Sequence, residues 1–299
     1  MTETTVIETP AEPALSDAEA PAKKRIDWKG EAKGIFWLLL AVLGFHSFIA
    51  KPFYIPSESM MPGLLVGDRL VVSKYPYGWS FVSPSFHVMP YAKGRVLGSL
   101  PKRGDVVIAS PPGVREDYIK RVIGLPGDRF EVRSGTVVIN GVPVKRGPVR
   151  YLDIADYGGV DMGGEETCSV SGYGANARAT KVGEEHCIVP VVRETLPNGR
   201  SYDTIDLGYY AEADDVAAIT IPAGHVFLMG DNRDKSADSR FPIERQGLGG
   251  PVPWENIGGR AEFITFSLDG STKLWNPISW FTALRSGRAG TGLQPDEAE

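Results

Sequence analysis

The sequence predicts a mainly β protein, in which antiparallel sheets carry an inserted second domain and follow one transmembrane helix. Three observations lead to this fold class. Short runs rich in valine, isoleucine and aromatic residues alternate with turn signals. The 299 residues include 35 glycines and 23 prolines, which favour a turn-rich β protein over a helical bundle. One long apolar run near the N-terminus carries no charge.

The first 33 residues are expected to form a disordered cytoplasmic tail. Residues 1 to about 22 are rich in Glu, Thr, Ala and Pro, a composition that cannot form a packed core. A basic cluster then leads into the apolar run: Lys23, Lys24, Arg25, Lys29 and Lys33. The positive-inside rule therefore places the N-terminus in the cytoplasm and the rest of the chain outside.

Residues 34–50 form the apolar run and are expected to be a transmembrane anchor. As a helix the run would be about 25 Å long, near the lower limit for a span. Phe53 and Tyr54 could extend it as interfacial anchors. A cleaved secretory signal is less favoured, because its leader would be shorter and a small residue would replace Phe48. A buried core helix is the other alternative.

Beyond the anchor, the sequence predicts strands wherever β-branched and aromatic residues cluster between turn signals such as Gly67-Asp68 and Gly127-Asp128. Asn140-Gly141 predicts a type I′ hairpin that joins the run 137–139 to the run 142–144. Helical periodicity is absent here, so these runs are expected to form an antiparallel β domain. The predicted strands are Arg69–Lys74, Asp105–Ala109, Tyr118–Ile123, Phe130–Arg133, Val137–Ile139, Ala217–Ile221, His225–Met229 and Arg260–Ser267.

Residues 146–216 differ in composition from the predicted strands and are interpreted as an inserted domain. They are rich in Gly, Asp, Glu and Ser and contain both cysteines, Cys168 and Cys187. Outside the cytoplasm these cysteines could form a disulfide, which would contribute on the order of 3 kcal/mol. Two free thiols are the alternative.

The C-terminal tail, residues 269–299, carries several large apolar side chains, among them Trp275, Trp280 and Phe281. They could rest on a membrane interface or cover the β domain, and both alternatives stay open. The net charge of -5 argues against a nucleic-acid partner. The cysteines and histidines have no zinc-type spacing, so neither a metal nor another cofactor is expected.

Two serines, Ser57 and Ser59, stand between Pro56 and Pro62 shortly after the apolar run. Because proline restricts both its own backbone and that of the residue before it, the segment is expected to be extended and stiff. Nine extended residues reach at most about 30 Å, so the serines should lie close to the membrane. A rigidly held serine could be a nucleophile, and an ordinary linker is the alternative.

A serine nucleophile needs a base, and histidine is an improbable one here because no triad-like context or Gly-x-Ser-x-Gly motif occurs. A lysine can act as the base if burial lowers its pKa. Lys120 fits, since strand alternation places it on one face with Tyr118 and Val122 while Arg121 points away. An exposed edge-strand lysine is the alternative.

Two further motifs need interpretation. Ser99-Leu100-Pro101-Lys102 has the Ser-x-x-Lys spacing of penicillin-recognising enzymes, but its proline predicts a loop, and the companion motifs of that class are missing. The polar block from Gly230 to Arg240 directly follows the predicted strand 225–229. Polar groups at a strand end are common in functional sites, although a plain exposed turn has the same composition.

Four motifs in this order resemble the bacterial type I signal peptidases, membrane-bound leader peptidases that use a Ser/Lys dyad. The resemblance covers the anchor and residues 51–144 and 217–268, but not the tails or the insertion. The matching segments are Pro56–Pro62, Arg103–Val107, Tyr118–Asp128 and Gly230–Arg240.

The resemblance implies a catalytic role for each matching residue. Ser59 would be the nucleophile and Lys120 the general base. Ser57 would donate its hydroxyl to the oxyanion hole beside the backbone N–H of Ser59. Ser236 would orient the Lys120 amine. Asp231, Asp238 and Arg240 would support the site, and Asp238 and Arg240 would form a structural ion pair.

The resemblance also implies a substrate and a location. The enzyme would be a monomer that removes signal peptides from exported preproteins at the outer face of the cytoplasmic membrane, with the lipid bilayer as its other partner. Its catalytic β domain would comprise residues 51–145 and 217–268. Shallow pockets for the small residues at positions -1 and -3 of the substrate would involve Ile55, Met60, Tyr118 and Ile119.

Two positions depart from the family pattern. Gly63 replaces the usual threonine, and Lys235 replaces a common asparagine and adds a positive charge near Ser236. A positive charge nearby would favour the neutral form of Lys120. Two other functions stay open: a membrane-tethered β module that binds exported peptides without cutting them, and a self-processing Ser/Lys protease.

Overall fold

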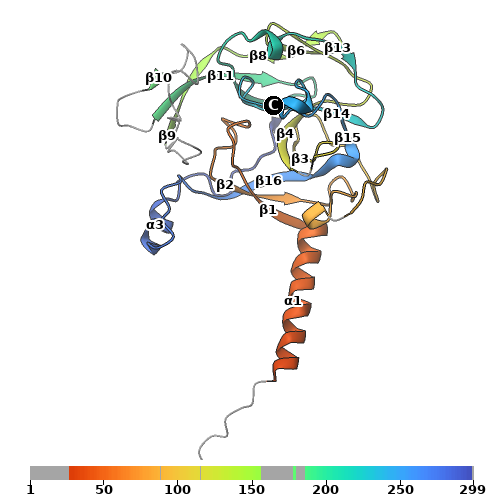
Figure 1. Ribbon diagram of the computed structural model, residues 1–299. Helices are drawn as coiled ribbons and strands as arrows, with labels where there is room; N and C mark the ends of the chain where they lie inside the picture. Colours follow the sequence, from red (N-terminus) through yellow and green to blue (C-terminus); the bar gives the residue numbers. More distant parts are fainter. Residues whose placement is uncertain (1–26, 88, 115, 156–177, 180–185, 298–299) are drawn as a thin grey trace, which may run out of the picture. The chain divides into compact units, whose positions relative to one another are not determined.

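The computed structural model describes residues 27–87, 89–114, 116–155, 178–179 and 186–297. Three sheets of seven, six and four strands confirm the predicted mainly β fold class, and the ladders that pair their strands are antiparallel (Figure 1). Backbone contacts divide the chain into two compact units, Met1–Leu40 and Ala41–Glu299. All the strands belong to the second unit.

Helix α1, Trp28–Phe48, is the one helix among the described residues that is long and apolar enough to cross a membrane. It begins six residues before the predicted apolar run, because residues 28–33 include good helix formers and an acidic side chain in the first turn. The helix ends before Pro52, and Phe53 and Tyr54 lie in strand β1 instead of extending it.

The seven-stranded sheet contains most of the strands that the sequence predicts, and it positions the residues discussed below. Lys120 in β4 lies opposite Val107 in β3, and Val122 lies opposite Leu228 in β14. The strand order is β1 (Ala50–Tyr54), β2 (Asp68–Ser73), β16 (Ile257–Ser267), β3 (Val106–Ala109), β4 (Tyr118–Gly124), β14 (His225–Met229) and β15 (Val252–Pro253).

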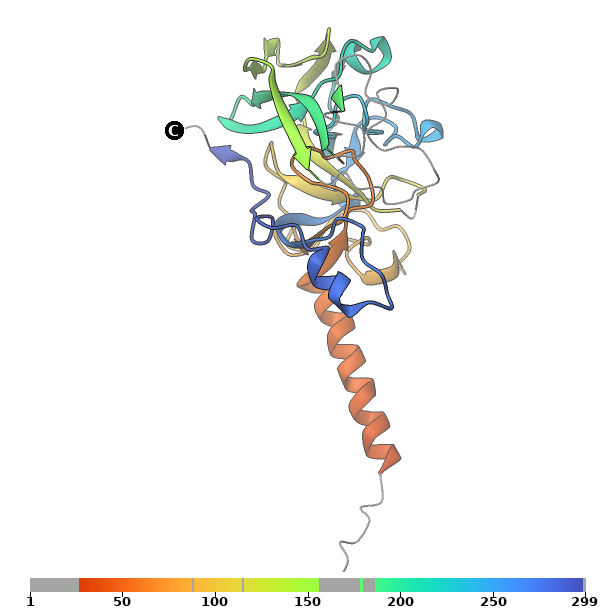
Figure 2. The same cartoon turned by 90° about the vertical axis from the view of Figure 1, so that its left-hand side faces the viewer.

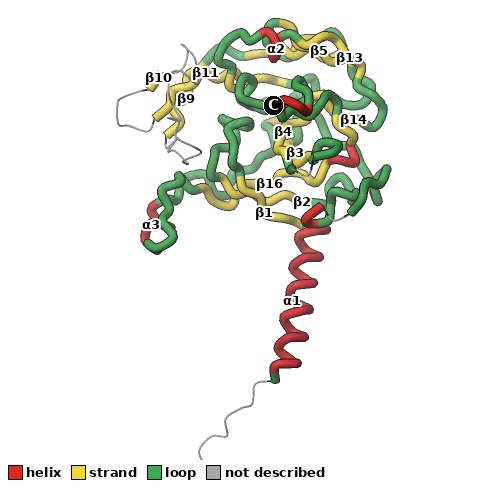
Figure 3. The backbone as a smooth tube through the Cα atoms, viewed as in Figure 1, coloured by secondary structure: helices red, strands yellow, loops and turns green. Residues whose placement is uncertain are grey.

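The four-stranded sheet contains the predicted hairpin. Asn140 and Gly141 have φ values of 55° and 80°, so both central residues of the turn have the positive φ that a type I′ turn requires. Phe130 of this sheet stacks on Phe227 of β14, with ring centroids 4.0 Å apart. The order is β13 (Val216–Thr220), β5 (Arg129–Arg133), β6 (Thr136–Ile139) and β7 (Val142–Pro143) (Figure 3).

Most of the six-stranded sheet lies in the segment interpreted as an insertion, for which the sequence predicted no strands, and its last strand comes from the C-terminal tail. Its side chains share the core of the other sheets: Tyr202 packs with Phe130 and Phe227, and Ile205 packs with Met61. Cys168 and the side chain of Cys187 lie outside the described residues, and so does the expected disulfide. The strands are β8 (Lys145–Arg146), β9 (Arg150–Ala155), β10 (Arg178–Ala179), β11 (His186–Thr195), β12 (Arg200–Ile205) and β17 (Asp296–Glu297).

The C-terminal tail covers part of the β domain, which is one of the two alternatives that the sequence left open. Its second half covers the seven-stranded sheet, where Leu293 is buried and Arg288 pairs with Asp68. The dark blue segment in Figure 2 runs from α3 (Pro277–Thr282) to β17. The first half leaves Trp275 and Phe281 exposed. The remaining short helices are η1 (Ser85–His87), α2 (Ala211–Asp214), η3 (Ile243–Arg245) and η4 (Trp254–Asn256).

Candidate active site

The serine segment after β1 forms a turn, so the expectation of an extended segment is wrong. The Met61 N–H donates to the Glu58 carbonyl at 3.0 Å, and the Leu64 N–H donates to the Met60 carbonyl at 2.9 Å. The side chains of Met60, Met61 and Leu64 are all buried. Burying three apolar side chains in one short segment folds the backbone back, and the φ fixed by proline is compatible with a turn.

Ser59 and Lys120 meet at the end of this turn. Lys120 Nζ donates a hydrogen bond to Ser59 Oγ at 2.7 Å. Lys120 is 3% exposed and Ser59 is 7% exposed. As strand alternation predicts, Lys120 shares a face with Tyr118, whose ring centroid lies 5.9 Å from Nζ. The structure therefore brings together the two groups that the sequence singled out separately.

Burial changes the protonation of the Lys120 amine. It lowers the Lys120 pKa to about 8, against the opposing attraction of Asp238 and Asp231 and with the help of the Arg240 charge. A lysine with this pKa is partly neutral near neutral pH, whereas an ordinary lysine is almost fully charged. Lys120 can therefore accept a proton from Ser59.

Two groups that can donate hydrogen bonds lie close to Ser59 Oγ: the Ser57 hydroxyl and the Ser59 backbone N–H. Ser57 Oγ lies 3.5 Å from Ser59 Oγ. Within the described residues, the backbone N–H of Ser59 makes no hydrogen bond. A hydroxyl and a backbone N–H beside a nucleophile are the groups that stabilise a tetrahedral oxyanion in acyl transfer.

Asp238 and Arg240 form a buried ion pair behind the site, with Arg240 Nε 2.9 Å from Asp238 Oδ1. Burial acts to raise the pKa of the Asp238 carboxyl, but the Arg240 charge and hydrogen bonds from Arg240 and the Gly230 N–H outweigh it and keep the pKa low. Asp238 also accepts a hydrogen bond from the Gly230 N–H at 3.0 Å. The pair therefore closes the 230–240 segment into a loop beside the dyad.

Ser236 lies in this loop but does not make the expected hydrogen bond to Lys120. Its Oγ is buried and has no hydrogen-bond partner among the described residues. The reason is local: the amine of Lys120 is directed at Ser59, and Ser236 Oγ lies against Gly230. A Cβ on Gly230 would stand 2.2 Å from Ser236 Oγ and 2.3 Å from the Ser59 carbonyl oxygen, so this close approach requires glycine.

Asp231 contacts the site indirectly, through Arg121, the residue that follows Lys120 in β4. Its carboxylate binds the Arg121 guanidinium in a bidentate pair, at 2.7 and 2.6 Å. Arg121 also donates to the Gly104 carbonyl at 2.8 Å. Charged pairs with this geometry are strong when buried, so the pair fixes β4 against the loop that follows β14.

No role was predicted for Asn232 from the sequence, yet this residue holds the nucleophile loop. Its backbone N–H donates to the Ser59 carbonyl at 3.2 Å, and its side-chain Nδ2 donates to the Glu58 carbonyl at 3.3 Å. Asn232 also forms a parallel bridge with Ile205 of the six-stranded sheet. Its place inside the polar block was visible, but a contact across 173 residues has no local signal in the sequence.

A second unpredicted contact ties the same loop to the inserted segment. Arg233 binds Glu194 of β11 at 3.0 and 2.6 Å, and Tyr202 donates to the same carboxylate at 3.2 Å. All three side chains are buried. The inserted segment therefore supports the geometry of the candidate site from behind.

A pocket of about 400 Å³ opens in front of the dyad and is named the catalytic pocket here. Ile55, Tyr118 and Ile119 line it as expected, but Met60 does not. Met60 lies in the core with Ile55 and Leu64, because the turn directs it inward next to Ser59. The lining comprises Phe53, Tyr54, Ile55, Pro56, Ser57, Ser59, Ile108, Glu116, Asp117, Tyr118, Ile119, Lys120, Lys235, Ala237 and Gln246.

The two departures from the family pattern lie close to this pocket. Lys235 lines it, while the charges that act on the Lys120 amine come from Asp238, Arg240 and Asp231. A Cβ on Gly63 would lie 3.5 Å from Asp231 Oδ2, an ordinary contact. The structure therefore has room for a Cβ atom at this position.

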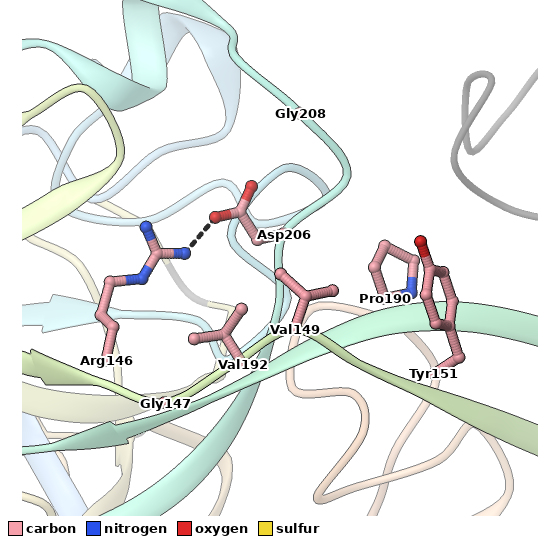
Figure 4. A pocket seen from close by; sticks show the side chains of 8 residues that line it. All are labelled: Arg146, Gly147, Val149, Tyr151, Pro190, Val192, Asp206 and Gly208. Carbon is pink, nitrogen blue, oxygen red and sulfur yellow. Dashed lines mark hydrogen bonds and ion pairs between the residues drawn. The ribbon is translucent and has the colours of Figure 1, made fainter.

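A separate pocket of about 440 Å³ lies on the six-stranded sheet (Figure 4). Arg146 and Asp206 form an ion pair at one side of it, and Val149, Val192 and Tyr151 supply apolar surface. The pocket contains neither a serine nor a lysine. Within the described ranges, no group of His, Cys, Asp and Glu side chains is arranged to hold a metal ion.

Comparison with known proteins gives consistent results. The profile of the family described as signal peptidase, peptidase S26, matches residues 28–266. Signal peptidase I of Rickettsia typhi is 33% identical over 247 residues, which is 80% of each chain. Signal peptidase I of Rickettsia canadensis is 34% identical over 249 residues, which is 81% of this chain and 79% of its own. A crystal structure of a signal peptidase I from Enterococcus faecalis aligns with 54% of this chain and 97% of its own, at 23% identity and a TM-score of 0.27.

Proposed function

The chain belongs to the signal peptidase family, peptidase S26, and is a serine endopeptidase; we propose that it removes signal peptides from exported preproteins with Ser59 as nucleophile and Lys120 as general base. The observation that carries this assignment is the 2.7 Å contact between Lys120 Nζ and Ser59 Oγ. Geometry comes first in assigning a base, and this distance is within reach of direct proton transfer.

The acylation step uses the neutral form of Lys120. Its lone pair accepts the hydroxyl proton of Ser59 as Oγ attacks the carbonyl carbon of the scissile bond. The oxyanion that forms is stabilised by the Ser57 hydroxyl and the Ser59 N–H. The Lys120 ammonium then gives its proton to the leaving amine, and the C–N bond breaks to leave an ester on Ser59.

In deacylation the neutral Lys120 amine removes a proton from water, whose oxygen attacks the ester. The same two donors stabilise the second oxyanion, and Lys120 returns the proton to Ser59 as the ester bond breaks. Once Ser59 is acylated, its Oγ no longer carries a proton for Lys120 to share. We assign Ser236, whose buried Oγ is otherwise unpaired, to hold the amine at that stage.

The shape of the catalytic pocket sets the substrate class. Ile55, Tyr118 and Ile119 present apolar surface next to the dyad. Apolar walls this close to the nucleophile suit small side chains, such as the alanines of an Ala-x-Ala cleavage site. Ile55 and Ile119 are buried in the same core cluster, so these walls are rigid.

The location follows from α1 and the charges before it. The helix is a candidate span, and the basic residues that precede it or lie in its first turns favour an N-terminus in the cytoplasm. The chain would then cross the membrane once, as a monomer, with the catalytic domain at the outer face of the cytoplasmic membrane. A bilayer that holds both the enzyme and the apolar segment of the substrate would position the scissile bond in advance.

Cleavage of a model preprotein with an Ala-x-Ala site tests this function. The detergent-solubilised wild type is expected to cut it, while Ser59→Ala and Lys120→Ala are expected to leave it intact. Circular dichroism should establish that both variants fold. Cleavage by either folded variant at the wild-type rate would contradict the assignment.

A further inference from the structure

A second cavity, of about 540 Å³, lies on the other side of the loop that joins β3 to β4. Its lining comes from three parts of the chain: residues 81–82 and 89–91, residues 110–114, and residues 253 and 256. Because four prolines line it, at positions 90, 111, 112 and 253, it is named the proline pocket. None of the proposed catalytic residues belongs to it.

The chemistry of the proline pocket suits an apolar group with one hydrogen-bond donor. Phe81 and Tyr91 meet edge to face, with ring centroids 5.1 Å apart, and Met89 adds a flexible apolar side chain. Asn256 is 3% exposed and lines the pocket, and its Oδ1 has no hydrogen-bond partner among the described residues. A buried acceptor without a partner is costly unless a ligand supplies the donor.

The proline pocket adjoins the catalytic pocket. Ser110 lines the proline pocket and Asp117 lines the catalytic pocket. The Ser110 hydroxyl donates to Asp117 Oδ1 at 2.7 Å, so one hydrogen-bonded pair separates the two cavities. An extended chain in one pocket can therefore continue into the other.

The distance along β4 fixes which part of a substrate would reach the proline pocket. Asp117 precedes Lys120 by three residues, which corresponds to about 10 Å in a strand. A peptide lying alongside would use about three residues to cover this distance. If positions -1 to -3 lie between Lys120 and Asp117, positions -4 to -6 lie at the proline pocket.

One wall of the proline pocket is attached to the C-terminal end of α1. Trp79 Nε1 donates to the Phe48 carbonyl at 2.8 Å, and the Ser85 N–H donates to Ser47 Oγ at 3.1 Å. These contacts hold Trp79 and Ser85, which flank Phe81 and Val82 of the pocket lining, against the last turn of the candidate membrane span. A substrate segment that leaves the membrane beside this turn would lie close to the pocket.

We propose that the proline pocket binds the apolar side chains that lie four to six residues before the cleaved bond of the signal peptide. The proposal rests on the proposed function and extends it, since it adds a specificity site outside the catalytic pocket. The occupant is the end of the apolar segment of the signal peptide, with a backbone N–H donating to Asn256 Oδ1.

The test compares three substrates that share one Ala-x-Ala site. The first carries leucines at positions -4 to -6, the second carries serines there, and the third is a short peptide that begins at -3. The full-length enzyme in detergent is used as wild type, as Tyr91→Ala, and as Phe86→Ala. Tyr91 is 66% exposed, so its truncation should not unfold the chain; Phe86 is 81% exposed in the same segment but does not line the pocket, which makes it the matched control.

Tyr91→Ala is expected to raise KM for the leucine substrate about tenfold, the usual effect of losing part of an apolar pocket. It should leave kcat, and both constants for the other two substrates, unchanged. Phe86→Ala should change none of them. This pattern would establish the subsite.

Three outcomes would overturn the proposal. Tyr91→Ala could leave KM for the leucine substrate unchanged, or change KM equally for the leucine and serine substrates. The loss could also vanish when a phospholipid is added, which would indicate a lipid chain in the pocket. In each case, cleavage of the short peptide by all three proteins would leave the proposed function standing. Cleavage of no substrate by the wild type would refute the proposed function itself.

Discussion

Two buried lysines, Lys120 and Lys74, differ in what surrounds their amines. Lys120 is 3% exposed and Lys74 is 4% exposed. Burial is the main cause that lowers the pKa of each to about 8. Lys120 Nζ lies 2.7 Å from a serine hydroxyl, whereas Lys74 Nζ lies 5.9 Å from the centroid of the Phe53 ring. A low pKa prepares a lysine to act as a base, but only contact with a nucleophile gives it something to activate.

The comparison also separates the energetic cost of burying a lysine from its catalytic use. Burying an amine destabilises its charged form wherever it occurs. At Lys120 that cost accompanies a hydrogen bond to Ser59 Oγ, while the Lys74 amine makes no hydrogen bond to a hydroxyl group in the part of the chain that the structure describes. The two positions therefore form a matched pair, in which one lysine tests the chemistry and the other controls for burial.

The largest expected effect comes from replacing each lysine by methionine, which keeps the volume and removes the amine. Lys120→Met should lower kcat/KM by at least about 1,000-fold, because Ser59 loses its base. Lys74→Met should stay within about threefold of wild type. Initial rates on an Ala-x-Ala peptide measure both. A comparable loss of kcat/KM in the two variants would contradict the distinction between the two lysines.

Ser57→Ala is expected to have the next largest effect. Removing one oxyanion donor typically lowers kcat by about 100- to 1,000-fold. The base is untouched, so the apparent pKa of the residual activity should stay near the Lys120 pKa of about 8. A pH–rate series on the variant measures both quantities. A shifted apparent pKa would mean that Ser57 acts on Lys120 as well.

Asn232→Ala should have a smaller effect, because it removes the single side-chain hydrogen bond to the Glu58 carbonyl and leaves the backbone bond to Ser59. We expect kcat to fall about tenfold as the nucleophile loop loosens, with KM nearly unchanged. The apparent pKa should not move. A general loss of folded protein would also leave KM and the pH profile unchanged, so active-site titration is needed to separate the two. The positioning effect lowers kcat per titrated active site, whereas a loss of folded protein lowers only the number of active sites.

The smallest effect concerns stability. Because the folded pKa of Lys74 lies below the unfolded value, the charged form destabilises the fold below about pH 8, and stability rises as pH increases from about 8 to 10.5. Lys74→Met should therefore raise the free energy of unfolding at pH 7 by about 1–3 kcal/mol and flatten its pH dependence. Denaturant titrations at pH 7 and pH 10 measure this. An equal gain at both pH values would contradict the explanation.

The sequence predicted the seven-stranded sheet well because its strands carry a strong local signal. The stretch from Tyr118 to Gly124 is rich in β-branched and aromatic residues, and the Asn140-Gly141 turn leaves few alternatives for the hairpin. Local patterns of this kind depend only on neighbouring residues. They also sufficed to select Ser57, Ser59 and Lys120 as candidates, while the choice of Ser59 as the nucleophile came from the family resemblance.

What the sequence did not predict depends on tertiary contacts. The burial of Met60 and Met61 turns the serine segment back on itself, although its prolines suggested an extended chain. The inserted segment has a polar composition, yet β11 and β12 pair and bury Val191 and Ile205 against Met61. Asn232 and Ser236 could be placed relative to Ser59 only once the loop that follows β14 had been folded next to the loop that follows β1.

The most direct test of the dyad is a titration of the two lysine amines. Protein labelled with carbon-13 at the lysine ε-carbons is titrated by NMR as wild type, Lys120→Met and Lys74→Met, so that each loss of a resonance assigns one amine. The account predicts that the Lys120 resonance titrates near pH 8 and that kcat/KM rises with the same apparent pKa, while the Lys74→Met profile matches wild type. A Lys120 resonance that titrates near pH 10, or activity that follows Lys74 instead, would contradict it.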